Sequence, residues 1–208
     1  MKKTILLLFI LTPLIMAFDY TVKPVEVLPI DSYPARISAD DITVAAVPYP
    51  DDKKSSEVFD VDNLNSKGFF PVHIIVRNSS PYYVKLKTQN VSLETRLGDR
   101  LYSTPATMVV EALIGNKYAD TLSHLKEGDR LSDKVATPLA DFTNKELKNS
   151  LLEPGSTESG FLFFYSEKSK HSLFIGSTLH VPMLYEEGTD KTFGPFDIAL
   201  DPSLDLPE

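Results

Sequence analysis

The chain has 208 residues, no cysteine and a formal charge of −8, with 29 acidic residues against 21 basic ones. A chain of this length can bury one sizeable core, and the lack of cysteine excludes disulfide-stapled scaffolds and zinc ribbons. The acidic balance argues against nucleic acid and anionic lipid as partners, because both bind clusters of lysine and arginine.

Residues 1–17 have the pattern of an export signal. Lys2 and Lys3 precede an apolar run over residues 4–16, and Ala17 is a small residue at which cleavage is expected. The run is shorter than the roughly 20 residues that a spanning helix needs. Cleavage would remove the two lysines and leave a formal charge of −10, with no cysteine for lipid attachment. We therefore expect a periplasmic or extracellular protein without a permanent transmembrane span.

An uncleaved N-terminal anchor is the alternative, because Ile15 is bulkier than the residue preferred two positions before a cleavage site. Residues 18–39 contain Pro24, Pro29 and Pro34 and show no sustained periodicity. They predict an extended arm, either an edge strand or a segment laid over the domain, with a disordered leader as the alternative. The acidic tail, residues 201–208, is expected to fray.

The dominant signal between these ends has a period of two. Residues 70–77 alternate so that Phe70, Val72, Ile74 and Val76 share one face, which predicts a half-buried strand with His73 on its solvent side. Residues 160–165 are apolar on both faces, as in a central strand. The other predicted strands are residues 41–47, 83–87, 91–96, 101–102 after a turn at 97–100, 173–183 in one phase with a bend at Gly176, and 193–200.

The middle of the chain carries helix signals. Thr104 and Pro105 predict the start of a helix with Met108, Val109, Ala112 and Leu113 on its apolar face, ending at Gly115. The sequence Thr143-Asn-Lys-Glu146 has the form of a capping box and predicts a second helix that stops at Pro154. Residues 53–65 are expected to form a short helical turn. The sequence thus predicts one mainly β domain over residues 40–200 with a partly helical insertion at 104–153.

Two stretches carry a resemblance to a known kind of protein: residues 68–80, which end in Val-Arg-Asn-Ser-Ser, and residues 158–165, a glycine followed by an aromatic strand. With the export signal, they resemble uncharacterised exported bacterial proteins with an immunoglobulin-like antiparallel β-sandwich. The resemblance covers about residues 41–102 and 157–199 and implies that fold. It implies no catalytic or binding residue.

The motifs of acyl-transfer enzymes are incomplete. Ser123 and Lys126 have Ser-x-x-Lys spacing, but Lys134 stands where the second motif needs asparagine, and Phe193 where the third needs glycine. Gly155 to Gly160 also lacks the spacing of a nucleophile elbow. We therefore predict no enzyme, and a hydrolase with an unrecognised site around Ser123, His124 and Asp129 is an alternative.

No metal or cofactor site is predicted. The four histidines show no ligand spacing, and His73 and His180 are expected to be exposed on strands. Asp60, Asp62 and Asn65 resemble a calcium loop, but Leu64 stands at the fifth ligand position and no glutamate at the twelfth. The pairs Asp40-Asp41 and Asp51-Asp52 are expected to be solvated turn residues.

The remaining candidates for function are tyrosines that could bind a partner. Tyr49, Tyr82 and Tyr83 lie beside turn prolines, and exposed tyrosine gives a large contact area at low entropic cost. We predict that these residues bind a protein or envelope component, with packing over the ends of the sandwich as the alternative. The leading hypothesis is a non-enzymatic exported binding module. The alternatives are an envelope assembly factor that docks through residues 18–39, the unrecognised enzyme, and a self-contacting surface protein.

Overall fold

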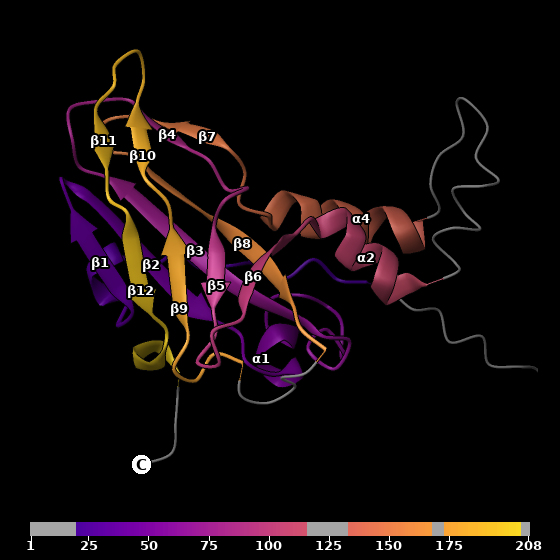
Figure 1. Cartoon of the computed structure of the whole chain (residues 1–208). Helices are drawn as coiled ribbons and strands as arrows, with labels where there is room; N and C mark the ends of the chain where they lie inside the picture. Colours follow the sequence, from indigo (N-terminus) through magenta and orange to yellow (C-terminus); the bar gives the residue numbers. More distant parts are fainter. Residues whose placement is uncertain (1–19, 116–132, 168–172, 205–208) are drawn as a thin grey trace, which may run out of the picture.

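The computed structural model describes residues 20–115, 133–167 and 173–204, and the side chains of 133–135 are left aside. The predicted export signal, residues 1–17, lies outside this range. Within it, the chain is mainly β, with an eight-stranded and a four-stranded sheet of antiparallel strands (Figure 1). The elements are β1 (Arg36–Ala39), β2 (Ile42–Pro48), α1 (Asp52–Ser56), β3 (Phe69–Asn78), β4 (Val84–Leu86), β5 (Ser92–Glu94), β6 (Arg100–Thr104), α2 (Ala106–Ile114), α4 (Asp133–Lys145), β7 (Ser150–Leu152), β8 (Thr157–Tyr165), β9 (Thr178–Val181), β10 (Leu184–Glu186), β11 (Thr192–Phe193) and β12 (Phe196–Ala199), with short 3-10 turns at Ile30–Ser32 and Asp201–Ser203.

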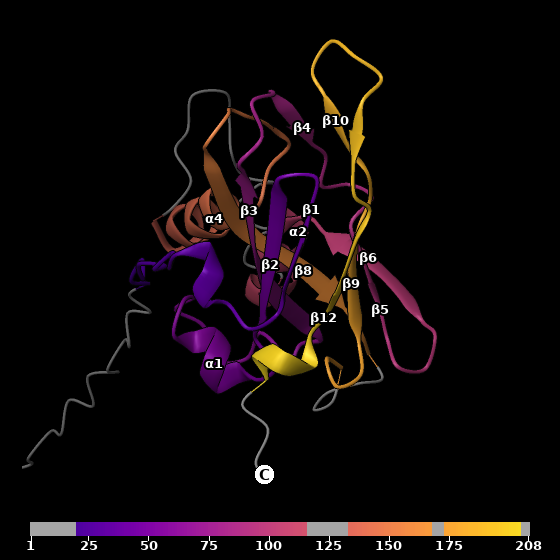
Figure 2. The ribbon, with the colours of Figure 1, turned by 90° about the vertical axis from the view of Figure 1, so that its left-hand side faces the viewer.

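The larger sheet, called here the barrel sheet, is nearly closed. Its strand order is β1-β2-β3-β8-β6-β5-β9-β12, and its end strands β1 and β12 lie side by side (Figure 2). The smaller sheet, called here the small sheet, has the order β11-β10-β4-β7 and lies at one end of the barrel. The predicted strands are thus confirmed in kind. The long strand predicted at residues 173–183 is wrong, because only Thr178–Val181 pairs as β9 in this stretch.

The centre of the barrel sheet is the β3–β8 pair, which is buried on both faces. Phe70, Val72 and Ile74 point into the barrel, while His73 and Ile75 point outward and are also buried. The prediction of a half-exposed strand at 70–77, with His73 in solvent, is therefore wrong. The prediction that residues 160–165 form a central strand is confirmed, because β8 pairs with β3 on one side and β6 on the other.

An outer layer covers this pair. Phe59 stacks on Phe142 of α4, with ring centroids 4.3 Å apart, and its edge contacts Phe161 of β8 at 5.0 Å. Val109 and Val110 of α2 join the same cluster. In Figure 1, α2 and α4 lie together on the outside of the barrel, so this aromatic cluster forms a second core between helices and sheet.

The N-terminal segment belongs to the same layer. From Tyr20 it runs over the outside of the barrel, buries Ile30 and Tyr33 against Ala45 and Ile75, and ends in the edge strand β1. Of the arm predicted at residues 18–39, the described part, residues 20–39, lies over the domain and is called the arm from here on.

The described part of the C-terminal tail is docked against the barrel. The hydroxyl of Ser203 donates to the carbonyl of Ala46 and accepts from the amide of Ala35, at 3.0 and 3.2 Å. Asp201 accepts from the amide of Gly176 at 2.8 Å. The prediction of fraying is therefore wrong for residues 201–204, because their polar groups find partners in the barrel wall; residues 205–208 lie outside the described range.

The turn between β1 and β2 has an unusual backbone. Asp40 and Asp41 have φ angles of 51° and 65° and form a two-residue hairpin loop. Such turns favour Asn-Gly or Asp-Gly, because positive φ costs most residues other than glycine, asparagine and aspartate on the order of 1 kcal/mol. Asp41 therefore stands where glycine is favoured. Both side chains are exposed, as predicted for solvated turn residues.

The helical insertion differs from its prediction at several positions. Helix α2 begins at Ala106, one residue later than expected, because Thr104 ends β6 and does not cap the helix. It ends before Gly115 as expected, although Met108 and Ala112 are exposed. The capping box at 143–146 is wrong: Thr143 lies inside α4, and Glu146 follows its end. The Glu146 carboxylate instead accepts from the amide of Ala106, at 2.9 Å, and caps α2. Residues 150–152 form β7 and not a helix.

Gly160 of β8 has no room for a side chain, because the backbone of Leu147 lies directly against it. The amide of Leu147 donates to the carbonyl of Phe161 at 2.9 Å, and a Cβ atom at Gly160 would lie 2.6 Å from the Leu147 backbone. We expect Gly160→Ala to lower the free energy of unfolding by about 2 kcal/mol, since backbone must shift to make room. Urea unfolding measures the loss. Ser159→Ala, one residue away on β8, is the control, and equal midpoints for the two variants would contradict this reading.

Candidate functional site

The outer face of the small sheet gathers exposed apolar and basic side chains. The strand register aligns Thr192, Tyr185, Lys85 and Leu151 in one row across β11, β10, β4 and β7. Tyr185 and Leu151 are 43% and 45% exposed. Tyr83 and Lys87 lie immediately before and after β4, and Met183 lies immediately before β10. All three are exposed, in alternation with the buried Val84, Leu86 and Leu184, which places them on this same face. We call these residues, without Thr192, the sheet face: Tyr83, Lys85, Lys87, Leu151, Met183 and Tyr185.

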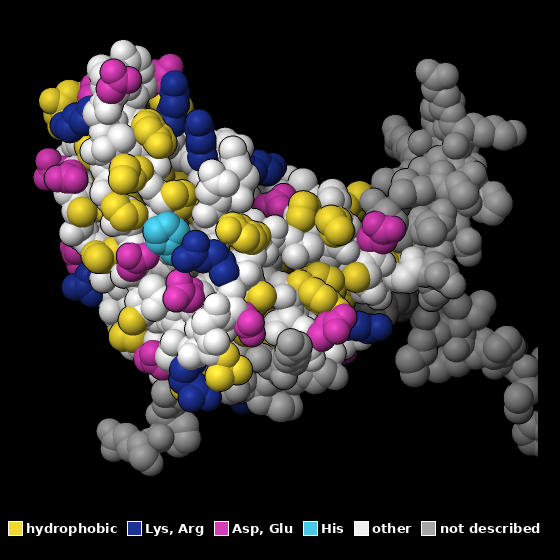
Figure 3. Space-filling view, viewed as in Figure 1, with side chains coloured by type: hydrophobic (Ala, Val, Ile, Leu, Met, Phe, Trp, Pro, Cys, Tyr) yellow, Lys and Arg dark blue, Asp and Glu magenta, His cyan; other side chains and the backbone are white. Residues whose placement is uncertain are grey.

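Lysine ammonium groups lie close to aromatic rings in this part of the molecule. The ammonium of Lys87 is 5.8 Å from the centre of the Tyr185 ring. At the adjoining edge, that of Lys191 is 4.0 Å from the Tyr82 ring. Lys85 instead pairs with Glu187, at 2.6 Å. Figure 3 shows hydrophobic, basic and acidic side chains interspersed over the end of the molecule where Figure 1 places β10 and β11. Within the described ranges, neither Lys87 nor Lys191 has a carboxylate within 4.0 Å.

The three predicted binding tyrosines do not lie together. Tyr82 and Tyr83 are 38% and 48% exposed at the edge of the small sheet, as predicted. Tyr49 is only 7% exposed and packs edge-on against Phe161, with centroids 5.3 Å apart, so the expectation that it is exposed for binding is wrong. Burial raises the pKa of the Tyr49 hydroxyl to about 12. Its neighbouring prolines suggested an exposed turn, but its amide is bonded to the carbonyl of Pro71 and continues the strand.

Sequence reasoning missed Tyr185, Met183 and Leu151. The predicted strand at 173–183 places Met183 in phase with the core residues Leu179 and Val181, yet it is 47% exposed. β9 ends at Val181 and β10 begins at Leu184, so Met183 lies in the connection between two strands. Pro182 was the available signal, because proline often interrupts a strand and resets its phase.

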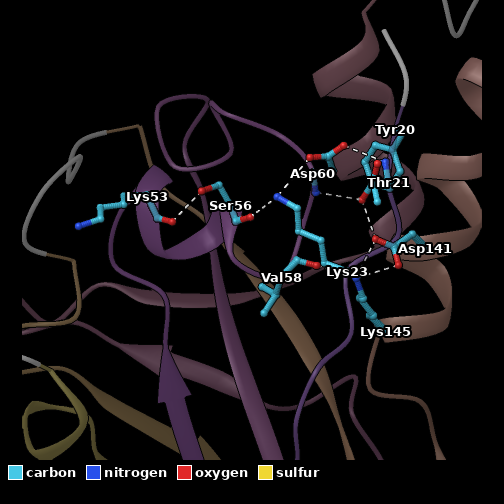
Figure 4. Close-up of polar contacts among 9 residues, drawn as sticks. All are labelled: Tyr20, Thr21, Lys23, Lys53, Ser56, Val58, Asp60, Asp141 and Lys145. Carbon is cyan, nitrogen blue, oxygen red and sulfur yellow. Dashed lines mark hydrogen bonds and ion pairs between the residues drawn. The ribbon is translucent and has the colours of Figure 1, made fainter.

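A second polar cluster joins the arm to α4 (Figure 4). The Tyr20 hydroxyl donates to Asp141 at 2.6 Å, and the Lys145 ammonium lies 2.8 Å from the other oxygen of the same carboxylate. Lys145 also donates to the carbonyl of Val58 at 2.6 Å. Asp141 is 2% exposed and Lys145 11%, so this is a nearly buried ion pair with satisfied hydrogen bonds.

A more exposed pair continues the cluster along the arm. Asp60 accepts from the amide of Thr21 at 2.8 Å and pairs with Lys23 at 3.2 Å. Lys23 also donates to the carbonyl of Ser56 at 2.6 Å. The bond from Thr21, followed by those from Lys23, lowers the pKa of the Asp60 carboxyl. Burial, together with the bond to Asp141, raises the pKa of Tyr20 well above its usual value.

The arm leaves two open hollows on the surface. One, of about 520 Å³, lies between residues 22–25 and α4 and is bordered by Asp141 and Lys145. The other, of about 510 Å³, lies between residues 28–34, the end of β2 and residues 173–175. Because the charged pair in the first hollow is already satisfied, the cluster holds the arm in place and offers no unpaired acid or base to a substrate.

The predicted calcium residues do not converge. Asp60 is bonded to the arm, and the buried amide of Asn65 donates to the carbonyl of Tyr49 at 2.8 Å while its oxygen accepts from Ser55 at 2.6 Å. Both ends of the Asn65 side chain are therefore already engaged. In the part of the chain that the structure describes, no three carboxylate or imidazole side chains are grouped as metal ligands.

The histidines occupy unlike environments. His73 is 3% exposed and stacks on Phe161 at 4.7 Å, and burial lowers the pKa of its imidazole to about 4. His180 lies at the surface of β9, with its Nδ1 atom 2.6 Å from Asp197. Their strands are not neighbours in the barrel sheet, so the two histidines share no site.

The enzyme alternative gains no support from the described residues. Ser123, His124, Lys126 and Asp129 lie outside them. The register does align Ser92, His180 and Asp197 across β5, β9 and β12. However, Ser92 is 1% exposed, and these described residues show no hydrogen bond from Ser92 to His180, so the row lacks an accessible, activated nucleophile.

Among the helices described, none is long and apolar enough to cross a membrane.

Comparison with known proteins identifies no family. No family model matches the chain, and no curated protein matches its sequence. Two solved structures are distantly similar. The candidate lipoprotein ycdA from Bacillus subtilis has 14% identity and a TM-score of 0.38 over 81% of this chain, which spans only 39% of ycdA. A functionally unknown protein from Listeria monocytogenes has 13% identity and a TM-score of 0.34, over 77% of this chain and 80% of its own.

Substitutions at the buried Asp141–Lys145 pair and at Tyr20 test how much these contacts between the arm and α4 stabilise the fold. We expect Asp141→Ala to lower the free energy of unfolding by about 4 kcal/mol, because it leaves the Lys145 ammonium buried without its counter-charge. Tyr20→Phe should cost about 1–2 kcal/mol, the worth of one bond to a carboxylate. Glu57→Ala, which breaks the exposed pair with Lys54, is the control and should cost under about 0.5 kcal/mol. Equal losses for Asp141→Ala and Glu57→Ala in urea unfolding would contradict this ranking.

His73 predicts an acid-sensitive stability. Its pKa is about 4 in the folded chain and near 6.5 when unfolded, so only the unfolded state binds this proton between those values. The contribution of neutral His73 to the free energy of unfolding is complete above pH 6.5. About 3 kcal/mol of this contribution is lost as the pH falls to 4. We expect the stability of His73→Leu to depend less steeply on pH over this window. His180→Gln is the control, and parallel pH curves for His73→Leu and the unmodified chain would refute the assignment.

Proposed function

We propose that the chain is an exported, non-enzymatic module that binds a protein partner through the sheet face. The carrying observation is the exposure of four large apolar side chains, Tyr83, Leu151, Met183 and Tyr185, in one surface with Lys85 and Lys87. Aromatic and methionine side chains are enriched at protein interfaces, and exposed apolar groups that share a face mark such surfaces more strongly than isolated ones.

The chemistry of the face suits a protein surface with some acidic character. Tyr83 and Tyr185 offer rigid contact area, and Lys87 has no carboxylate partner within the described residues. On a chain with a formal charge of −8, Lys87 is the group of this face best placed to attract an acidic partner, since Lys85 is paired with Glu187. A cell-envelope protein is the partner class that goes with the predicted export signal.

Two further parts of the proposal rest on sequence. The export signal at 1–17 would place the module in the periplasm or outside the cell. The immunoglobulin-like relationship would make it one of the many exported β modules that carry binding sites on strands and loops. The nearly closed barrel sheet and the attached small sheet are compatible with a mainly β binding module, and fold alone does not assign a function.

Docking of the arm on another protein is the less favoured alternative. The polar groups of its first residues are bonded to the chain's own domain, through Asp141 and Asp60. The sheet face, in contrast, has no covering element among the described residues. We therefore place the partner on the small sheet.

Cross-linking in the native cells tests the proposal. We expect Tyr83→Ala/Tyr185→Ala to reduce recovery of the partner at least about tenfold, since interface tyrosines are common hot spots. Tyr102→Ala/Tyr165→Ala removes two exposed tyrosines from β6 and β8 and should leave recovery unchanged. Unfolding midpoints must match across the variants. Full partner recovery with the first variant would overturn the proposal.

A further inference from the structure

Outside itself, the arm makes all of its described contacts with residues that follow it in the chain. It adds β1 to the edge of β2, through pairs from Arg36–Ala45 to Ala39–Ile42. It buries Ile30 and Tyr33 and bonds through Tyr20 to Asp141. All these partners lie after residue 41, so the arm's interface is complete between residues 20–39 and the remainder of the chain.

The two parts are joined by a strained hinge. Asp40 and Asp41 hold positive φ angles of 51° and 65°, in a turn type that favours Asn-Gly or Asp-Gly, so Asp41 is the residue that stands where glycine is favoured. In an extended strand φ is negative, so opening the turn relieves the backbone strain. Short strained hinges of this kind favour exchange of a segment between copies.

We propose that the chain dimerises by exchanging the arm, with Asp40 and Asp41 as the hinge and a second copy as the partner. In the exchanged form, β1 and β2 of one chain merge into a continuous strand, and each arm occupies the place of the other copy's arm. Every contact of the arm is retained, because the partner surface has the same sequence. The exchanged dimer therefore differs from the monomer mainly at the hinge, where the strain of the closed turn is lost. The dimer fraction rises with chain concentration.

The absence of cysteine permits a direct test by disulfide trapping. Ser38 and Thr43 are register partners whose hydroxyl oxygens lie 2.8 Å apart next to the hinge. In the full chain carrying Ser38→Cys/Thr43→Cys, the disulfide forms within one chain when the arm is closed and between chains when it is exchanged. Equal amounts of ¹⁵N-labelled and unlabelled chain are unfolded together, refolded at about 10 μM or about 1 mM, oxidised and digested, because exchange depends on concentration.

Mass spectrometry of the peptide linked through positions 38 and 43 gives the outcome. We expect mixed-isotope peptides that increase with concentration, reaching about half of the linked peptide when exchange is complete, as random pairing requires. Ser38→Cys alone is the control for adventitious disulfides and cannot give this peptide. Linked peptides of a single isotope composition at both concentrations would overturn the proposal.

A variant of the hinge tests whether the strained turn causes the exchange. Asp40→Asn/Asp41→Gly, added to the cysteine pair, provides the residues that the closed turn favours, so the mixed-isotope fraction should fall severalfold. Asp62→Asn/Asp190→Asn removes two exposed carboxylates elsewhere and should leave the fraction unchanged. An unchanged fraction in the hinge variant would show that the turn does not drive the exchange. Loss of the partner in the cross-linking experiment would not affect this result, because the arm lies apart from the sheet face.

Discussion

The β3–β8 pair has apolar side chains on both faces, and this requires the domain to provide cover on two sides. The barrel interior covers Phe70, Val72 and Phe164, while the outward residues Phe161 and Phe163 need a second layer. That layer comes from segments far apart in sequence: the arm, the residues after α1, and helices α2 and α4. Their packing is therefore a consequence of the central pair and not an accessory to it.

The polar contacts of the outer layer follow from the same requirement. Covering a sheet with irregular chain and helix ends brings backbone and charged groups out of water, and each then needs a partner. Asp141 and Lys145 satisfy one another and the ends of neighbouring segments, and Glu146 satisfies the first amide of α2. Gly160 lets the segment after α4 approach β8 closely enough to bond to it.

This dependence on distant segments explains what the sequence could and could not predict. The central position of β8 followed from local pattern, because residues 161–164 are apolar in both phases. The burial of His73 did not, since its cover comes from residues remote in the chain. Glu146 matched a local capping motif but bonds to Ala106, forty residues away. Tyr82 and Tyr83 were predicted to be exposed from their turn, whereas Tyr185 joins them only through the pairing of β10 with β4.

The same logic separates structural from functional candidates. Tyr49, Asn65 and Asp60 carry the side-chain types of binding or metal sites, yet each is engaged in holding the outer layer. The sheet face has exposed apolar groups with no such role among the described residues, and this supports it as the binding surface. Arm exchange, by contrast, would use the outer layer itself as the contact between copies.

Native-state hydrogen exchange tests the central claim that the outer layer and the barrel form one cooperative unit. The amide of Ala46 is bonded to Ala35 of the arm, and that of Leu147 to Phe161 of β8. In dilute solution, we expect both amides to exchange within about tenfold of the slowest amides of β3, because all should open only on global unfolding. Exchange of Ala46 and Leu147 more than about a hundredfold faster than β3 would contradict the account, since it would show that the cover opens while the barrel stays folded.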